Sequence, residues 1–362
     1  MLLKSIHLQN FRNMGLAALE FDGSSQFLFG LNGQGKTNLL EGISLLTALR
    51  SFRTQEAKTL IQHGKTEAQL LYKIEHEREG ELEILLKLKN QEKELYVHGN
   101  KVDKFSEFIG MIPTVVLSSE DMQLLRGAPS LRRKFIDLSL SAMDADYFRD
   151  LRRYHRALLE RNALLRQISS RSMVEVYNTI LAPLAFNIYQ KRIKTIELLR
   201  LYLMESYSEM VQEDEEPEII YRPDCILNSK ENFLEILGKG FERDSLLKAT
   251  QNGPHRDDLE FKMKSKGARQ YASEGQQRGL VMALRLAQIK YFHHCTGLKP
   301  IVLADDVLGQ LDPIRSEAFW RTLDTNFQVV GTGTTLPSGM SGREWQIFKV
   351  LEGSFNLDRI RV

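Results

Sequence analysis

The sequence predicts an α/β protein in which one mixed lobe is built from both ends of the chain and a mostly helical lobe is inserted between them. Segments of alternating polarity in residues 1–30 and 68–99 are typical of β-strands. From about residue 119 to 212 the apolar residues recur instead with the spacing of helices. Strand-like segments then return as EIIYR, DLEFKMK, PIVLADD, FQVVGTGT and WQIFKVLEG.

This change of pattern sets the expected boundaries of the two lobes. Residues 1–118 and 219–362 should form the mixed lobe, and residues 119–218 should form the helical lobe. An acidic run, EDEEPE at residues 213–218, ends the helical pattern. We expect that run to be a solvated loop, because charge runs of this kind prefer water.

Composition places the chain among ordinary globular proteins. It has 362 residues, of which 42% are hydrophobic and 27% are charged. The sequence contains no stretch of about 18 apolar residues, so we expect no membrane span. The N-terminus also lacks the apolar core of a signal peptide. The two cysteines, Cys225 and Cys295, suit a reducing compartment, so we expect a cytoplasmic protein. The net charge of +2 excludes no partner class, since nucleic-acid binding depends on where the charge lies.

Residues 30–37 read GLNGQGKT and fit the strict pattern of a phosphate-binding loop. The loop follows an apolar strand, SQFLF, and opens a helix predicted over residues 35–50. Its glycines let backbone N–H groups approach phosphate oxygens, while Lys36 can reach the β- and γ-phosphates and Thr37 can ligate Mg²⁺. The expected nucleotide-binding residues here are Gly30, Leu31, Asn32, Gly33, Gln34, Gly35, Lys36, Thr37 and Asn38. We also count Lys36 among the catalytic residues.

A nucleotide site of this type needs carboxylates at the end of a neighbouring strand. Residues 301–306 read IVLADD, an apolar strand followed by two aspartates. Asp305 is expected to hold Mg²⁺, and Asp306 to orient or deprotonate the attacking water. A whole lobe separates Lys36 from Asp305, whereas small-molecule kinases with phosphate loops usually return their carboxylate much sooner. A kinase therefore remains the alternative rather than the preferred interpretation.

Residues 271–291, YASEGQQRGLVMALRLAQIKY, predict a helix that begins with an unusual run of small polar residues. An ordinary N-cap would account for Ser273 alone. It does not explain Gly275 and Gln276. The free N–H groups at the start of a helix also form a natural anion site, so this stretch suggests a second contact with a phosphate.

Together these residues resemble the ATP-binding-cassette type of ATPase found in DNA-repair and chromosome-maintenance proteins. In that class a Ser-x-Gly-Gln signature closes over the γ-phosphate held by a second subunit. The resemblance therefore implies that Ser273, Gly275 and Gln276 act across an ATP-driven homodimer, with Ser273 also catalytic. It further implies a trans contact for Asp312, and a catalytic contact of the Thr332 hydroxyl with phosphate or water, which fits slow ATP hydrolysis.

Nearly the whole chain resembles the RecF family of recombination mediators. The matching segments are LQNFRN (8–13), GKTNLLEGI (35–43), LYVHGNKV (95–102), VVLSSEDMQLLRGAPSLRRKFIDL (115–138), NGPHRDDLEF (252–261), SEGQQRG and DDVLGQLD. Gly309 and Gln310 replace the Ser-Glu that is usual there, and His255 lies in a family motif. A chromosome-organising coiled-coil ATPase is the third interpretation, but the long heptad arrays that it needs are absent.

The resemblance implies a weak ATPase that binds DNA near single-strand/double-strand junctions and helps to load recombinase at gaps. The implied cofactors are ATP and Mg²⁺, and the implied partners are RecR, with RecO and RecA in the same pathway, in the nucleoid. Four arginines form a stripe on a helix predicted over residues 147–166: Arg149, Arg152, Arg153 and Arg156. We expect this stripe, with Arg132 and Arg133, to contact DNA phosphates rather than bases. An ordinary solvated helix face is the alternative.

Overall fold

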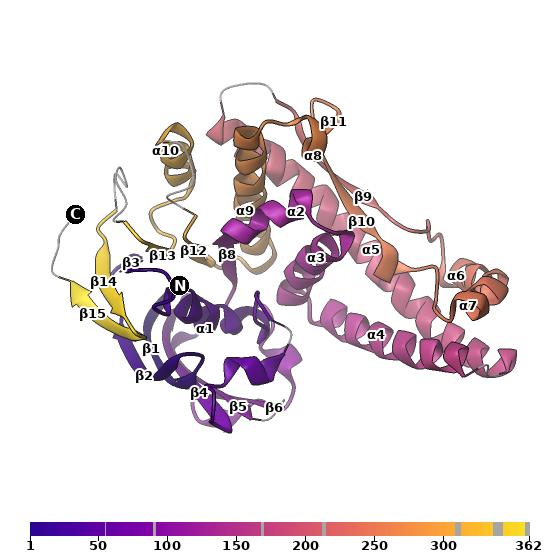
Figure 1. The fold of residues 1–362 in the computed structure, drawn as a ribbon, viewed down its shortest axis with the longest axis horizontal. Coiled ribbons are helices and arrows are strands. Elements are labelled where there is room, and N and C mark those ends of the chain that lie inside the picture. Colours follow the sequence, from indigo (N-terminus) through magenta and orange to yellow (C-terminus); the bar gives the residue numbers. More distant parts are fainter. Residues whose placement is uncertain are drawn as a thin grey trace.

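A computed structural model describes residues 1–54, 56–89, 92–167, 170–211, 215–307, 313–335 and 343–358 (Figure 1). The helices are α1 (Lys36–Ala48), α2 (Gln123–Arg126), α3 (Pro129–Met143), α4 (Ala145–Arg166), α5 (Arg171–Met210), α6 (Lys230–Lys239), α7 (Phe241–Leu247), α8 (Ala268–Tyr271), α9 (Glu274–Thr296) and α10 (Pro313–Thr322). The strands are β1 (Leu2–Phe11), β2 (Met14–Glu20), β3 (Ser25–Phe29), β4 (Glu67–His76), β5 (Gly80–Lys89), β6 (Glu92–Val97), β7 (Asn100–Lys101), β8 (Thr114–Ser118), β9 (Pro217–Arg222), β10 (Asp258–Met263), β11 (Lys266–Gly267), β12 (Ile301–Asp305), β13 (Val329–Gly333), β14 (Gln346–Leu351) and β15 (Ser354–Asp358).

Two six-stranded sheets form the mixed lobe. The first is antiparallel, in the order β2-β1-β4-β5-β6-β7. The second has the order β15-β14-β3-β13-β12-β8, and its strands are parallel except for β15. In the second sheet β3 and β8 come from the first third of the chain, and the other four strands come from its end. This confirms the prediction of an α/β lobe built from both chain ends.

Helix α1 lies between the two sheets, which explains why every residue from Leu39 to Thr47 is buried. Leu39, Ile43 and Leu46 are buried in a cluster that contains side chains of both sheets. A Cβ at Gly42 would lie 3.3 Å from Leu8 and 3.4 Å from Leu70, so glycine lets the helix approach the antiparallel sheet closely. The first residues of α1 are thereby fixed relative to the ends of the parallel strands.

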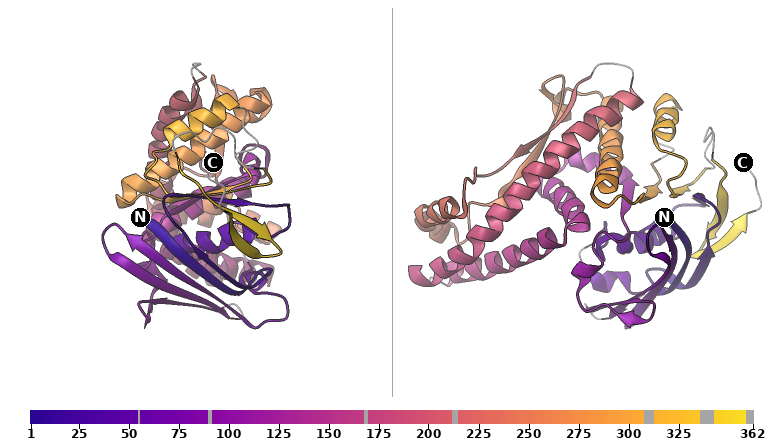
Figure 2. Two further views of the ribbon diagram at one scale, coloured as in Figure 1. Left: turned by 90° about the vertical axis from the view of Figure 1, so that its left-hand side faces the viewer. Right: turned by 180° about the vertical axis from the view of Figure 1, so that it is seen from behind.

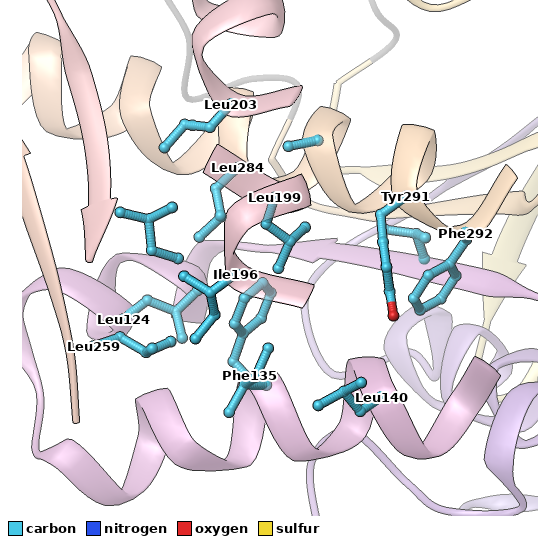
Figure 3. Close-up of a cluster of buried hydrophobic side chains, with 14 of the residues drawn as sticks. Leu124, Phe135, Leu140, Ile196, Leu199, Leu203, Leu259, Leu284, Tyr291 and Phe292 are labelled. Carbon is cyan, nitrogen blue, oxygen red and sulfur yellow. The ribbon is translucent and has the colours of Figure 1, made fainter. Parts of the chain in front are cut away.

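The opposite face of the parallel sheet packs against helices. Along β12, Ile301 and Leu303 join the cluster around α1, whereas Val302 and Ala304 join a second cluster with α3, α5 and α9. This alternation is the pattern of a strand buried on both faces. Figure 3 shows part of the second cluster, in which side chains of α2, α3, α5, α9 and β10 converge. These helices join the mixed lobe to the inserted one.

The inserted lobe is a long arm. Helices α4 and α5 extend away from the sheets, and β9, β10, α6 and α7 lie along them (Figures 1 and 2). The predicted lobe boundaries at residues 118 and 218 stay predictions. Because β9 and α6 pack on α5, we propose that the arm extends beyond residue 218. No helix among the described residues is long and apolar enough to cross a membrane.

A buried cation holds the base of this arm together. The guanidinium of Arg192 donates hydrogen bonds to Asp257 (2.6 Å), Asp137 (2.7 Å) and the Pro254 carbonyl (2.7 Å). Three chain segments distant in sequence therefore meet at one charge. A buried guanidinium is stable only when its donors are paired in this way, so the family segment around residues 252–261 contributes to the fold here.

Candidate nucleotide-binding site

The predicted phosphate loop connects β3 to α1 at the edge of the parallel sheet. Gly35 has a φ of 107°, in the left-handed region that disfavours any residue with a side chain. A Cβ there would also lie 3.0 Å from the Asn13 amide. At Gly30 a Cβ would lie 2.5 Å from the Val350 carbonyl oxygen. These two glycines are therefore required by the loop's own geometry, and residues 31–33 between them are exposed to a ligand.

The Lys36 side chain arches back under the loop. Only 6% of the residue is exposed, and its Nζ donates hydrogen bonds to the carbonyls of Gly30 (2.5 Å) and Leu31 (2.8 Å). Burial lowers the pKa of Lys36, and the charges of Asp306 and Asp305 act in the opposite direction. The ammonium thus lies between the loop and the two aspartates. It is positioned to exchange carbonyl partners for phosphate oxygens.

Asp305 lies where the phosphate loop meets the ends of strands β12 and β13. Its Oδ1 accepts hydrogen bonds from the hydroxyls of Thr37 (2.8 Å) and Thr332 (3.0 Å). The parallel register of β12 with β13 places Asp305 beside Thr332. Burial raises the pKa of Asp305, while the two hydroxyl hydrogen bonds act in the opposite direction. The structure therefore brings together Lys36, Thr37 and Asp305 as the sequence predicts.

Asp306 follows in a left-handed turn with a φ of 52°. Its backbone N–H donates to the Thr332 hydroxyl oxygen (3.0 Å), and its own side chain is exposed beside the loop. Thr332 is only 1% exposed, and its single hydroxyl proton is used on Asp305. The predicted contact of Thr332 with phosphate or water stays a prediction. In the described conformation Thr332 is a positioning residue for the two aspartates.

Four residues that support the loop were given no role from the sequence. Asn38 donates to Asn13 (2.8 Å) and accepts from Arg53 (3.0 Å). Glu41, fully buried one turn further along α1, accepts two 2.7 Å hydrogen bonds from Arg12. The segment LQNFRN and Arg53 therefore brace the start of α1. Arg12 and Asn13 lie in a family segment, but only the tertiary fold shows that they meet Glu41 and Asn38 there.

The signature residues begin α9 as expected. Ser273 is the N-cap, and its hydroxyl accepts the Gln276 N–H (3.2 Å), while the Gln276 side chain accepts the Ser273 N–H (2.7 Å). Ser273 is exposed, and Gly275 is half-buried. Figure 1 shows α9 beginning beside α8, at the end of the helix that lies far from α1. The structure therefore does not bring Ser273 to Lys36 of the same chain.

One acidic residue near the signature corrects an expectation. Glu215, in the run expected to be a solvated loop, is buried and accepts a hydrogen bond from the Gln276 amide (2.6 Å). The Tyr207 hydroxyl also donates to it. Glu215 thus orients a signature side chain from a neighbouring element. Asp312, with Gly309 and Gln310, lies outside the described residues.

The predicted arginine stripe is exposed along α4. Arg152 lies over the Phe148 ring (5.6 Å to its centroid), and Arg149 pairs with Asp146 (2.9 Å). Arg153 and Arg156 are also exposed. An exposed pair such as Arg149–Asp146 contributes little to stability, so it leaves that arginine able to exchange its partner for a phosphate. The stripe is therefore accessible, as the DNA-binding prediction requires.

The second basic cluster is different. Arg132 is only 8% exposed and donates two hydrogen bonds to Asp258 (2.6 and 2.9 Å). The prediction that Arg132 contacts DNA is therefore wrong, because its guanidinium is used inside the protein. The position of Arg132 in a helical pattern could not reveal this ion pair, since Asp258 is far away in sequence. Arg133 is half-buried and donates to the Asp257 carbonyl (2.8 Å), but it also reaches a cavity described below.

His255 has a structural environment. Its Nδ1 lies 2.7 Å from the Tyr154 hydroxyl and its Nε2 lies 3.1 Å from the Thr250 carbonyl. Because a carbonyl only accepts, Nε2 carries the proton and Nδ1 accepts from tyrosine. Burial lowers the pKa of His255 to about 4. The ring is therefore neutral near pH 7 and links α4 to the segment before β10.

The joined phosphate loop and aspartate strand, with a Ser-Glu-Gly-Gln helix start held apart from them, define an ABC-type ATPase fold. The chain matches the family described as the RecF/RecN/SMC N terminal domain over residues 2–344. A solved Smc head bound to a winged helix domain of ScpA shares this fold, with a TM-score of 0.56 at 14% identity, over 100% of this chain and 98% of that one.

Within this class, the chain belongs to the RecF family. It is 34% identical over 362 residues to the DNA replication and repair protein RecF of Lactobacillus johnsonii, covering 96% of each chain. Identity to the Streptococcus uberis protein of the same name is 36% over 345 residues, covering 93% of this chain and 94% of that one. A solved structure of the recombination mediator RecF with ATP in the RecFOR pathway has a TM-score of 0.89 and 32% identity, covering 98% of this chain and 97% of that one.

Proposed function

We propose that this protein is an ATP-dependent DNA-binding protein of recombinational repair and replication restart. ATP closes it into a dimer that binds DNA near junctions of single and double strands and helps to load recombinase at gaps. The proposal joins the family to the site geometry described above. A solved RecF structure contains ATP, and the loop around Lys36 fits the same ligand here.

The observation that carries the proposal is the separation of the signature from the phosphate loop. Lys36, Thr37 and Asp305 are already assembled in one chain. The exposed start of α9 lies away from them (Figure 1), and the Ser273 hydroxyl, which accepts the Gln276 N–H, keeps its own proton for an outside anion. Two copies arranged head to tail would place each signature on the other's γ-phosphate. ATP then acts as the adhesive between subunits.

Light scattering with ATP, ADP and no nucleotide tests this directly. A dimer is expected with ATP alone, because the signature needs the γ-phosphate to bind. A protein that stays monomeric under all three conditions would remove the basis of the proposal. A small-molecule kinase has no reason to change mass with ATP.

The residues around Asp305 also fit Mg²⁺. A carboxylate and a threonine hydroxyl, 2.8 Å apart, are hard oxygen ligands of the type that this ion prefers. Thr37 and Asp305 would hold the ion, which when bound would neutralise charge on the β- and γ-phosphates. Lys36 would bind the same phosphates from the loop. Asp306, exposed beside them, would orient a water for slow hydrolysis.

Asp306→Asn is expected to retain ATP binding but to slow phosphate release by roughly 100-fold or more, because the amide cannot accept a proton. Asparagine tolerates the left-handed φ of 52° at this position, so the turn should survive. The ATP-bound dimer should then persist for longer, as measured by light scattering over time. Asp103→Asn, an exposed carboxylate outside the site, is the matched control. Normal phosphate release by Asp306→Asn would assign the base elsewhere.

DNA binding by the α4 stripe makes a separate prediction. Replacing Arg149, Arg152, Arg153 and Arg156 with glutamine is expected to weaken duplex binding and to flatten its salt dependence. Each lost phosphate contact lowers the slope of log affinity against log salt by about one. ATP-driven dimerisation should not change. Titrations at several salt concentrations measure the slope, with the exposed Arg243→Gln on α7 as the control. An unchanged slope would mean that the solvated-face alternative holds.

The proposed partners follow from the family. RecF structures are described in the RecFOR pathway, so we propose RecR as the direct partner, with RecO and RecA acting in the same pathway. The protein would work on the nucleoid, where gapped DNA occurs. Binding to gapped, duplex and single-stranded DNA, each with and without ATP, tests the junction preference.

A further inference from the structure

A deep cleft separates the mixed lobe from the inserted arm. Its main cavity has a volume of about 800 Å³, and a second cavity of about 230 Å³ shares Arg50, Lys93 and Arg152 with it. The lining comes from the end of α1, from β6, and from α3 and α4, all labelled in Figure 1. Six cationic side chains line the two cavities: Arg50, Lys93, Arg133, Lys134, Arg152 and Arg156.

The protein balances this positive charge only in part, through the charges of Asp137 and Glu120 near Arg50, Arg133 and Lys134. Asp137 is the one carboxylate among the residues that line the two cavities, and it accepts a hydrogen bond from Arg192 behind the cleft. None of the six cations forms a salt bridge within the described ranges of the chain. Burial, with Arg50 nearby, lowers the pKa of Lys93 to about 8. Six cations against a single lining carboxylate indicate a site for an outside anion.

An aromatic side chain lies among these charges. The Phe148 ring lines the smaller cavity, with the guanidinium carbons of Arg50 and Arg152 at 5.2 and 5.6 Å from its centroid. Leu138, Leu151 and Leu159 add apolar lining to the larger cavity. Grooves that bind single-stranded nucleic acid combine cations along the sugar-phosphate backbone with aromatic and guanidinium groups on which the bases stack. A duplex is far too wide for a cavity of this size, whereas one strand fits.

We propose that this cleft binds a short unpaired stretch of a DNA strand, with Arg50 and Lys93 on its phosphates and the Phe148 region beneath its bases. The inference rests on the proposed function and deepens it. Arg152 and Arg156 belong both to the α4 stripe and to the cleft. A single-stranded extension of a duplex bound on the stripe could therefore enter the cleft. The Lys93 ammonium also donates to the Leu49 carbonyl at the end of α1. The strand would therefore contact the helix that begins at Lys36.

The double variant Arg50→Gln, Lys93→Gln tests the cleft without altering the α4 stripe. Its binding to oligo(dT) is expected to fall roughly tenfold or more, because two charge-assisted contacts are lost. The slope of log affinity against log salt should fall by about 1.4, since each single-strand phosphate contributes about 0.7. Binding to a duplex of the same length should change less than about twofold. Lys73→Gln, exposed on β4 away from the cleft, is the matched control.

Two results would overturn the inference while leaving the proposed function intact: equal loss of oligo(dT) and duplex binding, or no loss of either. Wild-type protein that bound neither DNA would instead contradict the proposed function. Thymidine monophosphate competing as well as oligo(dT), at equal phosphate concentration, would make the cleft a nucleotide site and not a strand site.

Labelling of the unaltered protein provides a test that does not depend on a variant folding. Because its pKa is about 8, Lys93 should react readily with an acylating reagent near neutral pH. Oligo(dT) should protect Lys93 but not Lys73, as read by mass spectrometry of peptides. Equal labelling of Lys93 with and without oligo(dT) would contradict a strand in the cleft.

Discussion

Lys36→Met is expected to abolish tight ATP binding. The ammonium would contact both the β- and γ-phosphates, and each charge-assisted hydrogen bond is worth about 1.5–3 kcal/mol. Losing two corresponds to roughly a 100-fold loss of affinity or more. Since burial already lowers the pKa of Lys36, the charge does not favour the folded state, and a methionine of similar length should fill its place. Calorimetric titration of ATP measures the effect.

Two comparisons make this prediction specific. Lys58→Met removes an exposed lysine that lies outside the loop, and ATP affinity should stay at the wild-type value. Thermal unfolding of Lys36→Met without nucleotide should match wild type, whereas ATP should raise the melting temperature of wild type only. Wild-type nucleotide affinity in Lys36→Met would show that the loop around residues 30–37 is not the ATP site.

The sequence predicts well those parts of the molecule that depend only on residues close together in the chain. The phosphate loop at residues 30–37 carries its own glycines, strand and helix, and β12 ends at Asp305 where the apolar run ends. The α/β lobe from both chain ends follows from the order of these segments. In each case neighbouring residues are sufficient, because strand and helix periods are local properties.

What the sequence does not predict depends on partners far along the chain. Arg132 and Arg152 both occur in helical patterns and look alike in the sequence. Arg132 is nevertheless hydrogen-bonded to Asp258 inside the protein, while Arg152 stays exposed. In the sequence, Glu215 looks like a solvated acidic residue, and only the tertiary structure shows that it is hydrogen-bonded to Gln276. The charge of the cleft is equally hidden, because Arg50 and Lys93 approach α4 only when the lobes assemble. Tertiary packing decides all three.

Ser273→Arg is expected to retain ATP binding and to lose ATP-driven dimerisation. Lys36 and Thr37, which we propose bind the nucleotide in the same chain, are untouched by a change at the start of α9. The large cation would block the helix start where we propose that another subunit's γ-phosphate docks. Loss of the N-cap also costs about 0.5–2 kcal/mol of stability. Ser229→Arg removes a comparable cap, at the start of α6, and controls for that loss because it should still dimerise.

Mixing Ser273→Arg with Lys36→Met tests whether the site is shared between subunits. A heterodimer contains one intact composite site, with Lys36 from the first chain and Ser273 from the second, while its other site carries both changes. Partial ATPase activity is therefore expected in the mixture when neither variant has any alone. At most half of the wild-type sites can be restored, because each heterodimer holds one intact site of two. Light scattering gives the decisive negative result: if Ser273→Arg alone forms a normal ATP-dependent dimer, the start of α9 does not lie at the interface.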